Sequence, residues 1–269
     1  MHRTTVLCSS ALAVILALPG VAAAQGIDFT FFLGRAYPIY DDRLTLRASV
    51  PALPGVEITS SDTLEIRTDG GLVFGGAVGF ELGVLAIEGR LDGTEVGFDS
   101  TRARYDLRAT QPPLTGLTGS ITFGAGRFEA ERLYLLSGNV RLRSPGPVSF
   151  VVSGGVSLLP DITITGSAPL SLELAGIPLT PAFDPRLRLR AAPGESEHRL
   201  GVNGGAGVRI GAGRLALIAE ARAFYFREYE LRFAVDDAPE LIAGLLDSLD
   251  PVRFEPVIVN AQIGLVVKF

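Results

Sequence analysis

The chain has 269 residues, of which 47% are hydrophobic, and a formal net charge of −5 at pH 7. This mildly acidic balance provides no basic surface for nucleic acid, and the single cysteine, Cys8, lies so near the amino terminus that disulfides are excluded from the rest of the chain. The mean hydropathy of +0.34 would suit a helical membrane protein. After residue 24, however, no apolar run approaches the roughly 20 residues that a transmembrane helix needs.

The amino terminus has the three parts of a secretory signal peptide. His2 and Arg3 form a weakly basic start, Val6–Leu18 is largely apolar, and Ala22–Ala24 supplies small residues before Gln25. The apolar part is too short to span a bilayer as a helix. We therefore expect cleavage after residue 24, which leaves one exported domain over residues 25–269.

The mature chain carries its hydrophobicity in short segments in which every second residue is apolar. In the first of them, Phe29 and Phe31 alternate with Asp28 and Thr30. A period of two predicts a β-strand with one apolar face and one mainly polar face. Eight such segments are expected, at residues 27–40, 72–82, 85–108, 131–143, 148–158, 199–210, 215–225 and 257–269.

The connections between these segments predict the topology. Three are tight turns, at Gly83, Gly146 and Gly213, and they alternate strictly with four long loops. A two-residue turn that begins with glycine suits a β-hairpin, and around Gly83 this register sets Gly79 opposite Glu88. Eight strands joined in this way form an all-β, up-and-down transmembrane barrel with short periplasmic turns, long extracellular loops and both termini in the periplasm.

Two other architectures compete with the eight-stranded membrane barrel. A ten-stranded barrel would result if residues 161–174 formed a further hairpin. A soluble barrel or sandwich would have to bury the charged face of the strands, at a cost of several kcal/mol for each unpaired ion. A partly hydrated lumen with the apolar face against lipid avoids this cost, so the membrane barrel is favoured.

The inward face is predicted to carry a lumen charge network made of Glu81, Glu88, Arg90, Asp92, Arg141, Arg143, Arg209, Glu220 and Arg222. We expect two groups of neighbours, which are Glu88, Arg90 and Asp92 with Arg141 and Arg143 on one wall, and Arg209 and Asn203 with Glu220 and Arg222 on the other. Eight strands enclose a lumen that side chains can just fill. The barrel is therefore expected to conduct ions poorly.

The fourth long loop contains the one convincing helical pattern. Asp237 can cap it, and Leu241, Leu245 and Leu249 recur at helical spacing before Pro251. We expect a short helix packed on the barrel rim, with contact to a hydrophobic ligand or a partner as the alternative. Further apolar loop segments, at residues 50–56, 112–117 and 174–181, could join it in an apolar vestibule.

The end of the chain matches a known pattern. Gln262, Gly264, Val267 and Phe269 fit polar-x-Gly-x-x-apolar-x-apolar, which resembles the C-terminal assembly signal of bacterial outer-membrane barrels. The whole mature chain resembles the small eight-stranded barrels typified by OmpA, OmpX and OmpW. The resemblance implies residence in the outer membrane as a monomer, in contact with its lipid and lipopolysaccharide, after delivery by periplasmic chaperones and the β-barrel assembly machinery.

The functions of that family range over envelope integrity, adhesion, passage of small hydrophobic molecules and lipid modification. His198 is the only histidine after residue 24, and it cannot assemble the His/Cys sets typical of zinc. Some family members are lipid A deacylases with a strand-borne histidine near a serine, but here Arg199 follows the histidine. We expect no enzyme, metal or cofactor, and an envelope-structural or surface-interaction role. Binding or passage of small hydrophobic molecules is the alternative.

Overall fold

The computed structural model describes residues 26–39, 41–44, 55–62, 64–113, 115–159, 164–167, 169–178, 186–191, 198–235, 252–255 and 257–269. The predicted signal peptide and the predicted loop helix, with Leu241, Leu245 and Leu249, lie outside these residues. All regular elements in the described ranges are β-strands. Among these residues, no helix is long and apolar enough to span a membrane.

Eight strands close into an antiparallel barrel. Each strand pairs with the barrel strands that precede and follow it in the sequence, and the first strand, β1, pairs with the last, β18. They are β1 (Gly26–Ile39), β4 (Leu64–Leu82), β5 (Leu85–Ser100), β8 (Gly126–Arg143), β9 (Val148–Leu159), β14 (Arg199–Ala212), β15 (Leu215–Phe226) and β18 (Val257–Lys268). The prediction of an eight-stranded barrel is confirmed. The ten-stranded alternative is wrong, because residues 164–167 pair with an extension of β8 beyond the closed barrel, while residues 170–174 belong to a second, five-stranded sheet.

The tight turns form as the glycines predict. Gly83 and Gly213 have φ of +73° and +66°, which glycine adopts without the steric cost that a side chain would add. The predicted register is also confirmed, since Gly79 pairs with Glu88 and Ala77 with Arg90.

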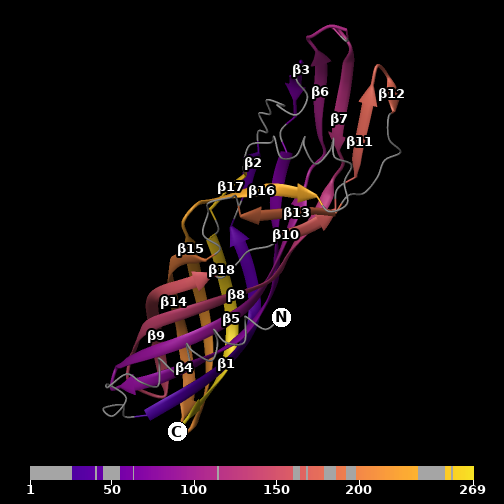
Figure 1. Cartoon of the computed structure of the whole chain (residues 1–269). Helices are drawn as coiled ribbons and strands as arrows, with labels where there is room; N and C mark the ends of the chain where they lie inside the picture. Colours follow the sequence, from indigo (N-terminus) through magenta and orange to yellow (C-terminus); the bar gives the residue numbers. More distant parts are fainter. Residues whose placement is uncertain are drawn as a thin grey trace, which may run out of the picture.

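Both ends of the barrel sequence lie at the end that carries the turns, which we call the turn side. The amide of Phe269 donates to the carbonyl of Ile27 over 2.9 Å, and the amide of Lys268 donates to the carbonyl of Arg214, in the turn after β14, over 2.8 Å. The long connections lie at the opposite end of the molecule, which we call the loop side. The carboxyl terminus is therefore far from the loop side (Figure 1).

One wall of the barrel continues beyond the other on the loop side. Strands β4 and β8 have 19 and 18 residues, whereas β9 and β15 have 12 each. The extra length of β8 pairs with β10, and the sheet continues through strands that sequence analysis missed. They are β2 (Asp41–Leu44), which pairs with β4, and β10 (Ile164–Ser167), β13 (Arg186–Ala191), β16 (Tyr229–Val235) and β17 (Val252–Phe254).

A separate sheet of five strands, the distal sheet, stands furthest from the turn side (Figure 1). It contains β3 (Val56–Ser61), β6 (Ala103–Ala109), β7 (Thr118–Phe123), β11 (Leu170–Leu174) and β12 (Ile177–Pro178). The predicted strand over residues 85–108 is therefore two strands. β5 ends at Ser100 in the barrel sheet, and β6 begins at Ala103 in the distal sheet.

The barrel has its polarity inverted relative to a soluble one. On β1, Asp28 and Thr30 are 0% and 5% exposed, while Phe31 and Leu33 are 61% and 53% exposed. The same pattern recurs on β15, where Leu215, Leu217 and Tyr225 point outward and Glu220 and Arg222 point inward. Large apolar side chains thus cover the outside of the barrel, and charged ones fill the inside.

Candidate functional site: the charged lumen

Arg90 joins two opposite walls of the barrel. From β5 it donates through Nε and Nη2 to the two carboxylate oxygens of Asp92, both at 2.8 Å, and through Nη1 to Glu220 on β15 at 3.1 Å. Its guanidinium carbon also lies 3.8 Å from the ring centre of Phe32. Since Arg90 is only 3% exposed, these bidentate and charge-assisted contacts replace its hydration.

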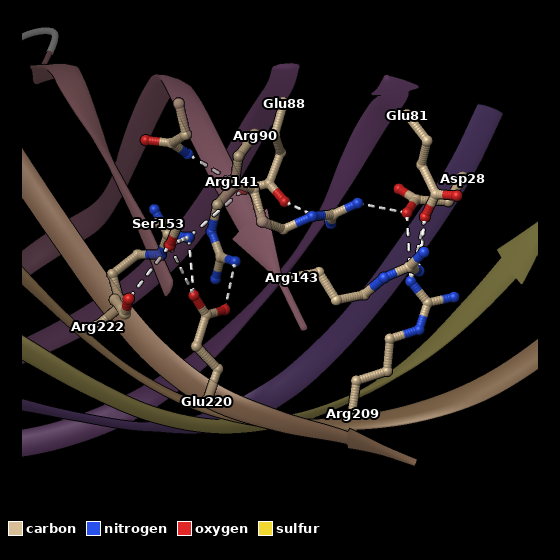
Figure 2. Close-up of polar contacts among 12 residues, drawn as sticks. Asp28, Glu81, Glu88, Arg90, Arg141, Arg143, Ser153, Arg209, Glu220 and Arg222 are labelled. Carbon is tan, nitrogen blue, oxygen red and sulfur yellow. Dashed lines mark hydrogen bonds and ion pairs between the residues drawn. The ribbon is translucent and has the colours of Figure 1, made fainter. Parts of the chain in front are cut away.

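Arg222 makes the second crossing of the lumen. Its Nη2 donates to Glu220 at 2.8 Å, to the hydroxyl of Ser153 at 2.7 Å and, across the barrel, to Glu88 at 3.4 Å. Its Nη1 donates to the side-chain oxygen of Asn203. Figure 2 shows Arg222 and Arg90 reaching Glu220 from different strands, so that one carboxylate holds two guanidinium groups.

The turn side of the network contains a third group of ions. Arg141 bridges Glu88, at 2.9 Å, and Asp28. Glu81 accepts from Arg143 at 2.8 Å, from Lys268 at 2.7 Å and from Arg209 at 3.4 Å. Every predicted member of the lumen charge network therefore lies inside the barrel and takes part in an ion pair with another charged residue.

The neighbours differ in part from those expected. Arg141 contacts Glu88 as predicted, but Arg143 contacts Glu81 rather than Glu88 or Asp92. Arg209 lies near Glu81 and Asp28 rather than near Glu220. Asp28 was not among the predicted members, although its place on β1 opposite the apolar face of Phe29 and Phe31 was the available signal.

A layer of apolar side chains, the apolar tier, follows the ions toward the loop side. Its members all face inward from β1, β4, β8, β9, β15 and β18, and none is more than 6% exposed; they are Ala36, Val73, Leu133, Leu135, Leu159, Phe224, Phe226 and Ile258. Sequence analysis missed this layer. The signal was the loss of alternation in runs such as residues 133–136 and 224–226, where consecutive side chains are apolar or aromatic.

The residues of the predicted assembly signal close the barrel. Gln262 donates to Glu220 at 2.9 Å inside the lumen. A side chain at Gly264 would meet the carbonyl oxygen of Phe31 at 2.7 Å, so β1 and β18 approach closely there. Val267 pairs with Phe29, and the ring of Phe269, 76% exposed, packs edge to face on Phe29 with ring centres 5.6 Å apart.

The described part of the chain contains no candidate metal centre. No group of three or more His, Cys, Asp or Glu there could hold a metal ion. His198 lies just before β14 and is exposed.

Comparisons with known proteins give structural similarities alone. No protein-family model and no curated protein matches the chain. The solved structures to which it is similar include Neisserial surface protein A, at 12% identity and a TM-score of 0.39 over 90% of this chain and 97% of that one. Another is the outer membrane protein OprG from Pseudomonas aeruginosa, at 12% identity and a TM-score of 0.46 over 91% of this chain and 97% of that one. The closed eight-stranded antiparallel barrel is itself the fold that the resemblance to small outer-membrane barrels implied.

Proposed function

We propose that the protein is an integral outer-membrane barrel that holds extracellular β-structure at the cell surface, in an envelope-structural or surface-interaction role. The observation that carries this proposal is the inverted barrel, in which Phe31 is 61% exposed beside a fully buried Asp28. Water would not stabilise that outer face, whereas hydrocarbon would.

The height of the outer apolar face supports the membrane assignment. On β15 it runs from Leu215 to Tyr225, and ten residue steps of a strand tilted by about 40° rise about 25 Å, which matches the apolar band of outer-membrane barrels. Tyr37, Tyr134 and Tyr225 lie exposed at the loop-side end of this face, where tyrosine prefers the membrane–water interface.

The loop-side structure supports a surface role rather than a pore. Ten strands of the described chain lie outside the barrel, and five of them form the distal sheet. The lumen beneath is filled by paired ions and then by the apolar tier. A chain that builds so much ordered structure on one side of a closed barrel is better suited to contact with partners than to conduction.

Surface labelling tests this orientation. Gly116 and Gly176 lie in turns of the distal sheet, and Gly146 lies in a turn-side loop. Tags at residues 116 and 176 should be labelled in intact cells, whereas a tag at residue 146 should be labelled only after the outer membrane is permeabilised. The reverse pattern would show that the protein is inserted the other way round, and labelling at none would indicate a soluble periplasmic protein.

We also propose that the carboxyl-terminal segment directs assembly by the β-barrel assembly machinery. Phe269 seals β18 against β1 through its backbone and its contact with Phe29. Deletion of Phe269 should reduce the amount of heat-modifiable protein in the outer membrane. The change Phe150→Ala, at an aromatic on β9 that is 69% exposed against 76% for Phe269, is the control and should assemble normally.

A second candidate function is the binding of small hydrophobic molecules on the loop side. The apolar tier favours binding over passage, because buried Phe224 and Ile258 stand between the loop side and the ion pairs. Purified protein should then bind a fatty-acid probe, and Leu241→Ser with Leu245→Ser should weaken that binding. Turnover of lipid A by the purified protein would instead require an enzymatic role.

A further inference from the structure

The turn-side mouth of the lumen, which we define as Asp28, Glu81, Arg141, Arg143, Arg209 and Lys268, has an unusual arrangement of charge. Glu81 alone holds three cations, through distances of 2.8 Å to Arg143, 3.4 Å to Arg209 and 2.7 Å to Lys268. The nearest second carboxylate, Asp28, is already bound by Arg141 and lies 3.6 Å from Arg209. Figure 2 shows Arg143 and Arg209 converging on this pair of carboxylates.

The mouth therefore has more cations than carboxylates. Its four cations and two carboxylates give a charge of +2 (4 − 2), or +1 (3 − 2) if Arg141, which also pairs with Glu88, is counted with the deeper group. The terminal carboxylate of Phe269 lies on the same rim and lowers this sum by one. The positive charge is therefore local, because three cations gather on the single carboxylate of Glu81.

Two of these cations are partly exposed and the third, Arg209, is buried at the base of the mouth. The side chain of Arg209 is 7% exposed, while those of Arg143 and Lys268 are each 25% exposed. Among the described residues, Arg143 contacts Glu81 through Nη1, and Arg209 contacts Glu81 and Asp28 through Nη1. Each guanidinium therefore has further N–H groups, and a partly buried cation pair with free N–H forks suits an anion with two or more oxygens.

We propose that the turn-side mouth is a binding site for an oxyanion, either a phosphate or a carboxylate, held by Arg143, Arg209 and Lys268 in competition with Glu81. The periplasmic location of the site rests on the proposed function, whereas the binding itself does not. A periplasmic molecule that bears phosphate or carboxylate groups could thereby dock beneath the barrel.

Titration calorimetry of the purified barrel with inorganic phosphate, and separately with acetate, tests the proposal at constant ionic strength set by sodium chloride. Wild-type protein should bind one of the two saturably. Arg143→Gln and Lys268→Gln should each weaken binding about tenfold, because a charge-assisted contact is lost. Glu81→Gln should strengthen it about tenfold, because the competing carboxylate is removed.

Arg214→Gln is the matched control, since Arg214 lies exposed in the turn on the same rim without belonging to the mouth. It should leave the affinity unchanged, and heat-modifiable migration verifies that each variant is folded. Tighter binding of phosphate than acetate assigns the site to phosphate groups, and the reverse assigns it to carboxylates.

Equal affinity for the anion in the wild type and folded Arg143→Gln, or weaker binding by folded Glu81→Gln, would overturn the proposal. Binding by the purified protein combined with failed surface labelling would overturn only the proposed cellular orientation. Correct labelling without saturable binding would overturn only the anion site.

Discussion

Strand β1 in the barrel and strand β6 in the distal sheet alternate with the same period but with opposite chemistry. On β1 the buried residues are polar, with Asp28 at 0% exposure, and Phe31 faces outward. On β6 the buried residues are Tyr105 and Leu107, at 3% and 7% exposure, while the ion pair of Arg104 and Asp106 faces outward with side chains that are 50% and 44% exposed. Each strand buries the face that its surroundings cannot solvate, which is the pattern expected if hydrocarbon surrounds the first and water surrounds the second.

The change from buried polar residues to buried apolar residues occurs within a short part of the chain. On β5 the buried residues pass from Arg90 and Asp92 to Val96, and the next strand buries Ala103. The apolar tier lies beside this change, toward the loop side of the ion pairs. The end of the outer apolar face and the end of the charged lumen therefore coincide, as expected if both mark the limit of the membrane.

The largest expected difference between the two regions concerns their ion pairs. Arg222, 1% exposed, holds Glu220 and Glu88, which are also paired with Arg90 and Arg141. Arg222→Ala therefore removes one of two counter-ions from each buried carboxylate and should lower the free energy of unfolding by up to about 3 kcal/mol. Arg104→Ala breaks a solvated pair in the distal sheet and should have little effect. Urea unfolding in lipid vesicles, followed by circular dichroism and heat-modifiable migration, measures both.

Similar losses of unfolding free energy for Arg222→Ala and Arg104→Ala would show that the lumen is hydrated like an open surface. Arg222→Lys provides a further control, because it retains the charge but loses the second guanidinium nitrogen, through which Arg222 donates to Asn203 while the first donates to Glu220 and Ser153. The free energy of unfolding of Arg222→Lys should lie between those of the wild type and Arg222→Ala.

The outer faces should differ almost as much. Val152 is 54% exposed on β9, in the middle of the outward-facing run from Val148 to Val156. Val152→Arg places a charge in hydrocarbon and should cost about 2–4 kcal/mol of folding free energy in vesicles. Thr118→Arg, at an exposed position of β7, places the same charge in water and should be tolerated, as the same unfolding measurement can check. Equal tolerance at both positions would place water, not lipid, around the barrel.

The sequence predicted the barrel well because its signals are local. The alternation around Phe29 and Phe31 and the tight turns at Gly83 and Gly213 each depend on a few adjacent residues. Register follows directly from turn and period, which is why the pairing of Gly79 with Glu88 was predicted correctly.

Contacts across the lumen could not be predicted in the same way. Arg90 and Glu220 are 130 residues apart, and their meeting depends on barrel diameter and strand tilt rather than on either local pattern. The short strands of the loop side, such as β10 with four residues between β8 and β13, have too few residues to show a period. Their pairing is decided by long-range packing.

The stability of the distal sheet should also depend on pH in a way that the stability of the barrel does not, although this effect is smaller. Burial, with the charge of Asp62, raises the pKa of Tyr105 in the distal sheet to about 12. The unfolded tyrosine ionises near pH 10, so the free energy of unfolding of the distal sheet should not change below that pH. It should fall by about 2–3 kcal/mol as the pH rises from about 10 to about 12. Limited proteolysis of the distal sheet across this range measures the loss.

Tyr105→Phe should remove this dependence. The hydroxyl of Tyr105 has no hydrogen-bond partner within the described chain, so its removal should cost little at neutral pH. An alkaline loss that persists in Tyr105→Phe would assign the effect to another group.

The smallest expected effect is an electrical current close to zero. In planar bilayers the wild type should show no steady conductance, because the lumen contains two obstructions in series. Arg222→Ala should loosen only the ion pairs, and the apolar tier, with Phe224 at 0% exposure, should still exclude water and ions, as hydrophobic constrictions do. The double change Arg222→Ala with Phe224→Ala opens space in both layers and is the variant expected to conduct. Steady porin-like conductance from the wild type would show that the lumen is open, and conductance from Arg222→Ala alone would show that the ion pairs are the only barrier.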